Sequence, residues 1–208
     1  MFFSDLGRFW APEQDCALCG ALSGRTLICA ACEHSLPRSD PAPGLVARYA
    51  YAFPVDRLVQ RFKFGGDLAV GRWLGERLAE RAGSRPRPDW LVAPPLAAAR
   101  MRERGFNQAH ELARTVGHSL GIPVAWRGVA RARDTRHQPG LGRAARRANL
   151  AGAFTCARDL RGRRLAIVDD VLTTGATAEA LAAALRRAGA ASVDTWVVAR
   201  TPEPECSK

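Results

Sequence analysis

The chain lacks long hydrophobic runs, and none of its 208 residues belongs to a stretch approaching about 18 consecutive uncharged apolar positions. A helix that spans a bilayer needs such a stretch, so we expect no transmembrane helix. The first residues, Met1–Asp5, include an acidic side chain and no basic flank, which is a poor match to a secretory signal peptide. These two absences predict a cytoplasmic protein.

Lysine is also scarce, with two lysines against 29 arginines. A GC-rich genome produces the same bias and explains most of it, although arginine offers a bidentate geometry toward phosphate that lysine lacks. The arginines are unevenly placed. Residues 100–164 hold 15 arginines and four acidic residues, so this segment alone carries the net charge of +11. Charge concentrated in this way predicts a polyanionic ligand, either pyrophosphate or a nucleic-acid backbone.

Aromatic side chains are few in the same segment, which contains only Phe106, Trp126 and Phe154. Sequence-tolerant binding of single-stranded DNA usually combines a basic groove with aromatic side chains on which bases stack. Trp126 and Phe154 lie in expected strands, so the segment contains few aromatic side chains on which bases could stack. This weakens the hypothesis of a dedicated groove for single strands.

Six cysteines include two C-x-x-C pairs near the N-terminus, formed by Cys16 and Cys19 and by Cys29 and Cys32. Four thiolates can close a tetrahedral Zn²⁺ site, and a closed site of this kind is structural because it leaves no position for a substrate. A single pair would also suit a redox motif, but the βαβ context is missing and two pairs favour a metal. We therefore predict an N-terminal helix and a zinc-ribbon-like module in residues 1–36.

The remaining chain alternates expected strands with expected helices. Strands are expected at 48–53, 90–93, 124–129, 152–156, 165–168 and 193–199, and helices at 55–64, 68–82, 109–120 and 178–188. This alternation predicts an α/β fold with a doubly wound parallel sheet. We place this domain at residues 37–200 and expect residues 201–208 to form a disordered tail.

The most informative run of the sequence is 165–177. Four apolar residues, 165–168, predict a strand that is buried on both faces, and Asp169 and Asp170 follow it. A small-residue loop, Thr173-Thr174-Gly175-Ala176-Thr177, then opens a helix. Loop amides and a helix N-terminus suit a phosphate, and carboxylates accept hydrogen bonds from sugar hydroxyls. The alternative is an ordinary turn with a Thr N-cap, which accounts for one threonine only.

This run resembles the ribose-phosphate signature of type I phosphoribosyltransferases, which bind 5-phosphoribosyl 1-pyrophosphate (PRPP). Four further stretches resemble one branch of that superfamily, the ComF group of competence and DNA-utilisation proteins: 62–67, 104–109, 135–138 and 147–150. With the cysteine pairs, the resemblance covers nearly the whole chain in the expected order. It implies that a sheet of phosphoribosyltransferase type follows the zinc module along the chain.

The resemblance also implies roles for residues at the strand ends, where ligands collect in open α/β sheets. Asp169 and Asp170 would contact the ribose hydroxyls, and residues 173–177 would hold the 5-phosphate. Residues 93–96 take the place of the pyrophosphate loop, with Arg100 and Arg104 close behind it. Mg²⁺ would bridge the pyrophosphate oxygens.

Residues 130–149 take the place of the superfamily's mobile catalytic loop. The candidates on this loop are Arg136, His137, Gln138 and Arg147. A lid of this kind would close over PRPP and keep water from the reactive carbon. The alternative is a solvated, arginine-rich surface loop.

Three other polar residues allow more than one interpretation. Asn107 and Gln108 either orient a base or phosphate, or cap the helix that begins near residue 109. Lys63 ends an expected helix next to Gly65, where the helix dipole adequately explains a basic residue.

Two functions remain open from the sequence. One is a Mg²⁺-dependent phosphoribosyltransferase that moves ribose 5-phosphate from PRPP to a nitrogenous acceptor. The other is a non-catalytic, single-stranded-DNA-binding competence factor that keeps the fold and works with DNA-uptake proteins. The two are compatible, since a protein in DNA uptake can retain PRPP binding.

Overall fold

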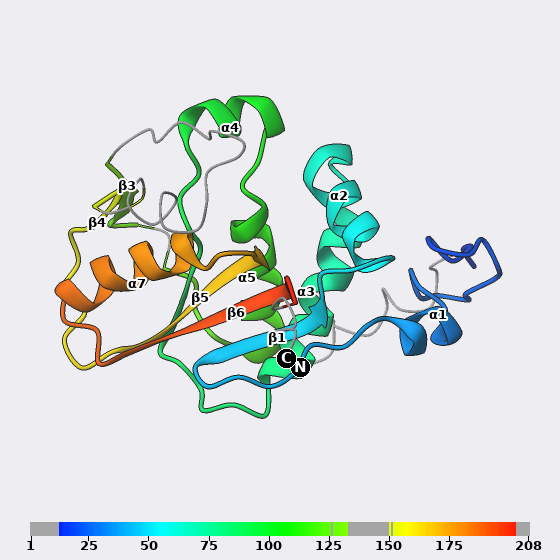
Figure 1. The fold of residues 1–208 in the computed structure, drawn as a ribbon, viewed down its shortest axis with the longest axis horizontal. Coiled ribbons are helices and arrows are strands. Elements are labelled where there is room, and N and C mark those ends of the chain that lie inside the picture. Colours follow the sequence, from blue (N-terminus) through cyan, green and yellow to red (C-terminus); the bar gives the residue numbers. More distant parts are fainter. Residues whose placement is uncertain (1–12, 126, 133–149, 151, 203–208) are drawn as a thin grey trace, which may run out of the picture. The chain divides into compact units, whose positions relative to one another are not determined.

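The computed structural model describes residues 13–125, 127–132, 150 and 152–202 (Figure 1). The chain divides into two compact units, Met1–Pro37 and Arg38–Lys208. The four candidates on the expected catalytic loop lie outside the described residues, and so does the expected N-terminal helix. Among the helices in the described ranges, none is long and apolar enough to cross a membrane.

A four-stranded sheet with the order β1-β6-β5-β2 forms the centre of the larger unit, and all its neighbouring strands are parallel. Its strands are β1 (Leu45–Ala50), β2 (Trp90–Val92), β5 (Arg164–Leu172) and β6 (Ser192–Arg200). The predicted parallel α/β sheet is thereby confirmed. A separate antiparallel pair is formed by β3 (Val129–Arg131) and β4 (Phe154–Cys156).

Helices cover both faces of this sheet (Figure 1). The helices of the larger unit include α2 (Val55–Gly65), α3 (Leu68–Ala82), α4 (Ala98–Arg104), α5 (Gln108–Leu120) and α7 (Ala176–Arg187), while α1 (Ala30–Ser35) belongs to the N-terminal unit. Helices α3 and α5 pack against each other and against the sheet, and α7 packs against β5 and β6. This arrangement leaves the ends of the strands as the places where polar side chains can gather.

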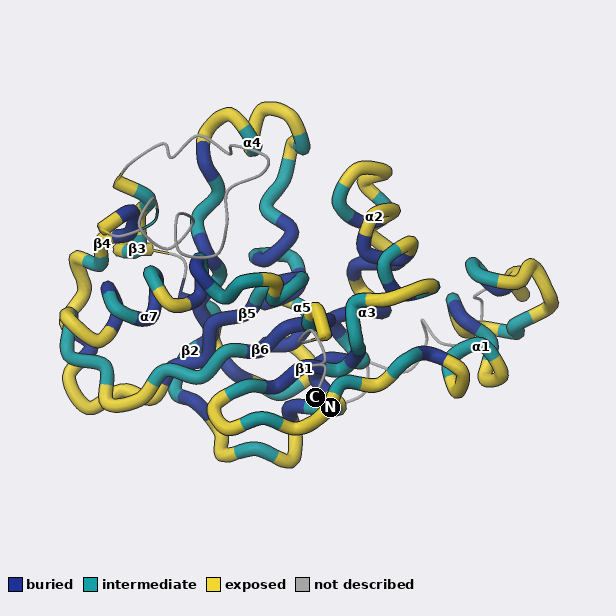
Figure 2. Tube along the Cα trace, in the orientation of Figure 1, coloured by how far each residue is buried: buried dark blue, intermediate teal, exposed yellow. Residues whose placement is uncertain are grey.

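Strand β5 runs through the core, as the buried part of the trace in Figure 2 shows. Leu165 and Ile167 are buried in a cluster with Leu181 and Leu185 of α7. Because side chains alternate along a strand, the equally buried residues between them face the opposite side of the sheet. Burial on both faces matches the continuous apolar run in the sequence.

Several element boundaries differ from the sequence-based expectations. Strand β5 continues to Leu172 because it pairs with β6 as far as Leu172 opposite Arg200, so both aspartates lie within the strand. Helix α4 was not expected at all. The strand expected at 124–129 is reduced to a single bridge between Leu91 and Val124 before β3 begins. Pairing with β6 sets the end of β5, and local propensity alone does not report such pairing.

Candidate functional site

Four thiols converge in the N-terminal unit. The sulfur atoms of Cys16, Cys19, Cys29 and Cys32 all lie within 4.8 Å of one another. The Sγ atoms of Cys19 and Cys29 are 3.8 Å apart. Tetrahedral Zn–S bonds of about 2.3 Å require sulfur separations of about 3.8 Å, so the donor set suits a metal such as zinc. The predicted convergence of the two C-x-x-C pairs is confirmed.

Local backbone geometry positions these thiols. Gly20 has a φ of +73° and donates its amide to the carbonyl of Cys16 at 2.9 Å, which closes a tight turn around the first pair. The backbone amide of Cys29 donates to the Cys16 Sγ at 3.3 Å, and α1 begins one residue later. The second pair therefore straddles the start of a helix.

The electrostatics of the cluster favour ionisation of Cys16 and oppose ionisation of Cys32. Burial disfavours ionisation of Cys16, but backbone hydrogen bonds, including those involving Cys19 and Cys29, outweigh it and lower its pKa to about 6. Side-chain hydrogen bonds with Cys19 and Cys29 raise the pKa of Cys32 to about 12. Four thiolates can coexist at these distances only with a cation among them, which is the condition that a bound divalent metal satisfies.

Two carboxylates lie near the carboxyl end of β5 in the larger unit. Asp170 is 8 % exposed, and its backbone amide donates to Asp169 Oδ1 at 2.9 Å. Burial raises the pKa of Asp169 to about 7, and the negative charge of Asp170 acts in the same direction. The positive charges of Lys63 and Arg100 partly offset this increase. Asp169 is therefore near the midpoint of its titration at neutral pH.

Lys63 is the partner of Asp170, a role that was not predicted from the sequence. Its Nζ lies 2.8 Å from Asp170 Oδ1, and the two side chains are 19 % and 12 % exposed. The helix dipole of α2 explains a basic residue at this position in general, but it does not explain a contact with a buried carboxylate. One signal in the sequence could have found it, because Lys63 is one of only two lysines in a chain with 29 arginines.

The loop after β5 presents unused backbone donors. Gly175 has a φ of +77°, which favours glycine, and it is the N-cap of α7. The amide of Ala176 donates to Thr174 Oγ1 at 3.4 Å, so Thr174 contacts the first turn of α7, although Gly175 and not a threonine is the N-cap. Within the described residues, the amides of Thr173, Thr174 and Gly175 have no hydrogen-bond acceptor. Such an array beside a helix N-terminus is suited to an anion.

The loop after β2 is fixed to the start of α5. Asn107 Nδ2 donates to the carbonyl of Pro94 at 3.0 Å, and Asn107 Oδ1 accepts from the amide of His110 at 3.3 Å. Asn107 therefore caps α5, the second of its two interpretations, and also ties this helix to the expected pyrophosphate loop. Arg100, on α4 after the same loop, lies close enough for its charge to act on Asp169.

Arg104 and Gln108 pair with each other. Arg104 Nη1 donates to Gln108 Oε1 at 3.0 Å, and the Arg104 guanidinium lies 5.1 Å from the ring centroid of Phe64. Gln108 is 1 % exposed, so its side chain supports Arg104 in this structure instead of facing solvent. Phe64, at the end of α2, is 68 % exposed. The structure thus brings Asp169, Asp170 and Arg100 together and turns Arg104 toward α2.

The contribution of the Lys63–Asp170 ion pair to the free energy of unfolding can be tested by substitution. Lys63→Met leaves a buried carboxylate without its partner and should lower the free energy of unfolding by roughly 3 kcal/mol. Adding Asp170→Asn to this variant should recover part of the loss. Arg72→Met, which removes an exposed ion pair with Glu76, is the matched control and should cost less than about 1 kcal/mol. Urea unfolding at neutral pH measures all of these values, and additive single-variant effects would contradict the coupling.

The sequence of the chain is similar to those of known proteins. Residues 103–207 match the family described as Phosphoribosyl transferase domain. A DNA utilization protein YhgH from Salmonella typhi is 35 % identical over 193 residues, covering 89 % of this chain and 84 % of the relative. Competence protein F from Haemophilus influenzae is 35 % identical over 159 residues, covering 72 % of this chain and 69 % of the relative. Competence protein ComFC from Bacillus subtilis is 29 % identical and covers 89 % and 78 %.

These matches extend beyond the loop that suggested the resemblance. The family match includes the whole of β5, the loop after it and α7. The matches to the relatives cover most of this chain as well as most of their own lengths. The chain belongs to the ComF family of the phosphoribosyltransferase superfamily.

Proposed function

We propose that this protein binds PRPP together with Mg²⁺ at the carboxyl end of β5 and acts in DNA utilisation or uptake. The observation that carries the proposal is the juxtaposition of the Asp169–Asp170 pair with the free amides of residues 173–175. A phosphosugar needs both an anion cradle and hydroxyl acceptors, and this strand end supplies both. The names of the relatives, DNA utilization protein and competence protein, support the biological role.

Each part of the site would take one part of the ligand. The amides of residues 173–175 would hold the 5-phosphate, and the two carboxylates would accept hydrogen bonds from the ribose hydroxyls. Arg100, whose charge acts on Asp169, and the residues after β2 would face the departing pyrophosphate. Carboxylate oxygens are the hard donors that Mg²⁺ prefers, and the bound ion would neutralise charge on the pyrophosphate oxygens.

If the site is catalytic, the reaction is a substitution at C1 of the ribose. The bond between C1 and the pyrophosphate oxygen breaks, and pyrophosphate leaves with the electron pair. A bond from C1 to an acceptor nitrogen forms, and that nitrogen loses a proton. Asp169 would stabilise the developing positive charge on the sugar ring, and Arg100 would stabilise the leaving group. The second candidate, a competence factor without transferase activity, would bind PRPP without releasing pyrophosphate.

Substitutions in the loop and the strand test PRPP binding. Thr174→Glu places a negative charge in the phosphate cradle and should abolish binding, whereas Thr155→Glu, an exposed position on β4, should not. Asp170→Asn removes a charged acceptor and should weaken binding by about 1–3 kcal/mol. Calorimetric titration with PRPP, with and without Mg²⁺, measures these effects. The proposal is wrong if wild-type protein gives neither heat nor a thermal shift with millimolar PRPP and Mg²⁺.

The raised pKa of Asp169 predicts how the affinity for PRPP depends on pH. Its raised pKa means that it is largely protonated below about 7 and becomes a carboxylate as the pH rises through that value. A protonated acid is a poorer acceptor for a hydroxyl and a poor ligand for Mg²⁺, so affinity for PRPP with Mg²⁺ should increase across this range. Asp169→Asn should remove this step while retaining the titration of PRPP itself. An identical pH profile in the two proteins would exclude Asp169 as the titrating group.

We further propose that the four thiols of the N-terminal unit hold one structural Zn²⁺. Elemental analysis of the purified protein should find about one zinc per chain. Replacing both Cys29 and Cys32 by Ser should abolish metal binding and unfold this unit, because folding and metal binding are coupled. Cys156→Ser, a cysteine of β4, is the matched control and should retain the metal. Protein that is free of metal after purification without chelator or oxidant would contradict the proposal.

A further inference from the structure

The opposite end of the sheet, where β5 begins and α7 ends, carries a second polar surface. Three backbone hydrogen bonds join the segments that meet there: Leu160 N to Ala188 O at 2.8 Å, Ala191 N to Arg163 O at 2.8 Å, and Asp89 N to Arg164 O at 2.7 Å. The residues just before β5, just after α7 and just before β2 therefore form one continuous surface. We call it the arginine surface.

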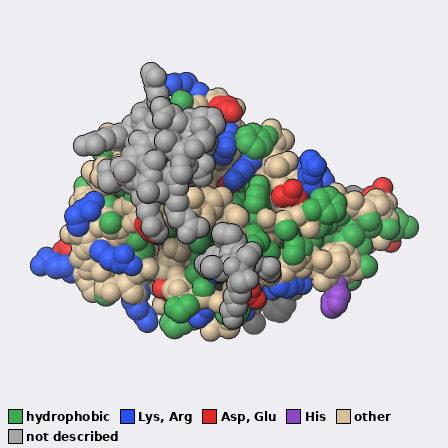
Figure 3. Space-filling model, viewed as in Figure 1, with side chains coloured by type: hydrophobic (Ala, Val, Ile, Leu, Met, Phe, Trp, Pro, Cys, Tyr) green, Lys and Arg blue, Asp and Glu red, His purple; other side chains and the backbone are tan. Residues whose placement is uncertain are grey.

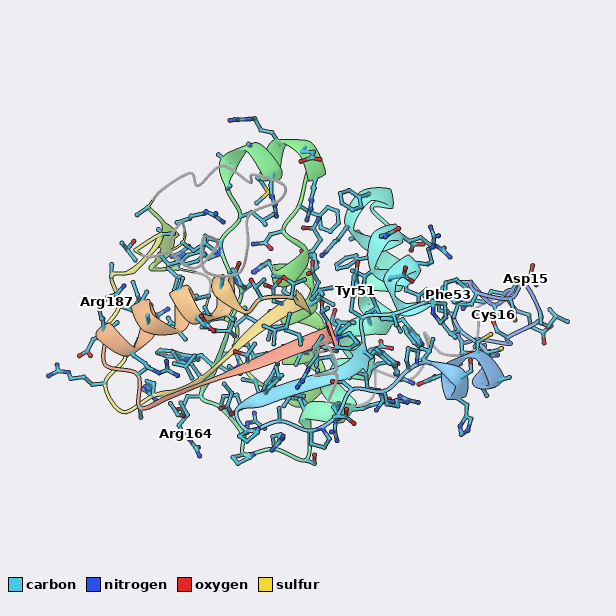
Figure 4. All side chains as sticks on the ribbon, in the orientation of Figure 1. Asp15, Cys16, Tyr51, Phe53, Arg164 and Arg187 are labelled. Carbon is cyan, nitrogen blue, oxygen red and sulfur yellow. The ribbon has the colours of Figure 1, made fainter. Side chains whose placement is uncertain are left out.

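Exposed guanidinium groups dominate the arginine surface. They belong to Arg158, Arg161, Arg163, Arg164, Arg186 and Arg187. Figure 4 labels Arg164 and Arg187 at this end of the sheet, and Figure 3 shows basic side chains over the same region. Asp159 lies 2.7 Å from Arg161 and neutralises it. Within the described part of the chain, the guanidinium groups of the other five arginines have no carboxylate partner. Asp89 accepts from the backbone amide of Arg164 at 2.7 Å and not from its guanidinium.

Two of these arginines are held in place by an aromatic ring. The guanidinium carbons of Arg158 and Arg163 lie 4.7 Å and 5.1 Å from the ring centroid of Trp90. Both distances are within the range of a cation–π interaction. Trp90 itself packs against the hydrophobic cluster of β5 and α7, so the platform is anchored in the core. Arginines fixed in this way lose less conformational entropy when they bind an anion.

We infer that the arginine surface binds the phosphate backbone of a nucleic acid. Five like-charged groups that have no carboxylate partner among the described residues repel one another, and they release their counterions when a polyanion binds. Guanidinium groups match phosphate oxygens in bidentate geometry. Because the ring of Trp90 is already engaged by two arginines, it offers little room for a base to stack. Binding should therefore be sequence-tolerant and depend on phosphate contacts.

This inference goes beyond the proposed PRPP site and does not depend on it. The two surfaces lie at opposite ends of β5, because Arg164 is its first residue and Asp169 and Asp170 lie near its other end. A variant of the arginine surface should therefore keep the thermal shift with PRPP and Mg²⁺. Loss of nucleic-acid binding and loss of PRPP binding can be told apart in the same preparation.

The test measures fluorescence anisotropy of a labelled oligothymidylate over a series of salt concentrations. Arg158→Ser combined with Arg163→Ser should flatten the plot of log Kobs against log salt by roughly 1.4, since each lost phosphate contact on a single strand contributes about 0.7. Arg72→Ser combined with Arg114→Ser removes the same charge from exposed ion pairs on α3 and α5 and should leave the slope unchanged. Equal slopes for both double variants would overturn the inference.

Further measurements keep the test decisive if the first variant folds poorly. Arg186→Ser combined with Arg187→Ser changes two exposed positions at the end of α7 and should reduce the slope without touching Trp90. Wild-type protein that does not bind the oligonucleotide at low salt would overturn the inference. Binding to anionic lipid vesicles in place of the oligonucleotide would do the same and would identify a membrane as the polyanion.

Discussion

The parallel pairing of β5 with β6 is the constraint on which the larger unit depends. It keeps β5 extended as far as Leu172, so that two adjacent aspartates are carried on an interior strand of the sheet. Hydrophobic burial on both faces of the strand holds it in register, and a slip of one residue would exchange the positions of Asp169 and Asp170. The chemistry proposed for the site therefore relies on apolar residues that never touch a ligand.

The two neighbouring carboxylates have different surroundings. Asp170 has Lys63 at 2.8 Å, which compensates its charge. Asp169 has no ion pair with any described residue, and burial raises its pKa to about 7. A buried carboxyl group with a raised pKa is common at functional sites, because it can exchange a proton near neutral pH. Here the difference arises because side chains alternate along a strand, which turns the two carboxyl groups toward different neighbours.

The sequence predicted features that depend on local pattern. The spacing of the four cysteines and the alternation of strands and helices are local, and the structure confirms both the convergence of the thiols and the parallel sheet. Features that depend on distant contacts were missed. The pairing of Lys63 with Asp170 joins residues on α2 and β5, and no periodicity or motif encodes that distance. The extension of β5 through two aspartates likewise required knowledge of its neighbour, because aspartate alone disfavours strands.

The length of β5 has a consequence for how the protein could work with two ligands. Arg164 and Asp169 are separated by five residues of extended chain, or about 17 Å. This distance exceeds the Debye length of about 8 Å at physiological ionic strength. A polyanion at one end and a phosphosugar at the other would therefore neither collide nor repel each other strongly. If both proposals hold, ligands at the two ends of β5 would not exclude each other, and one folded chain could hold a phosphosugar while it remains attached to a strand of nucleic acid.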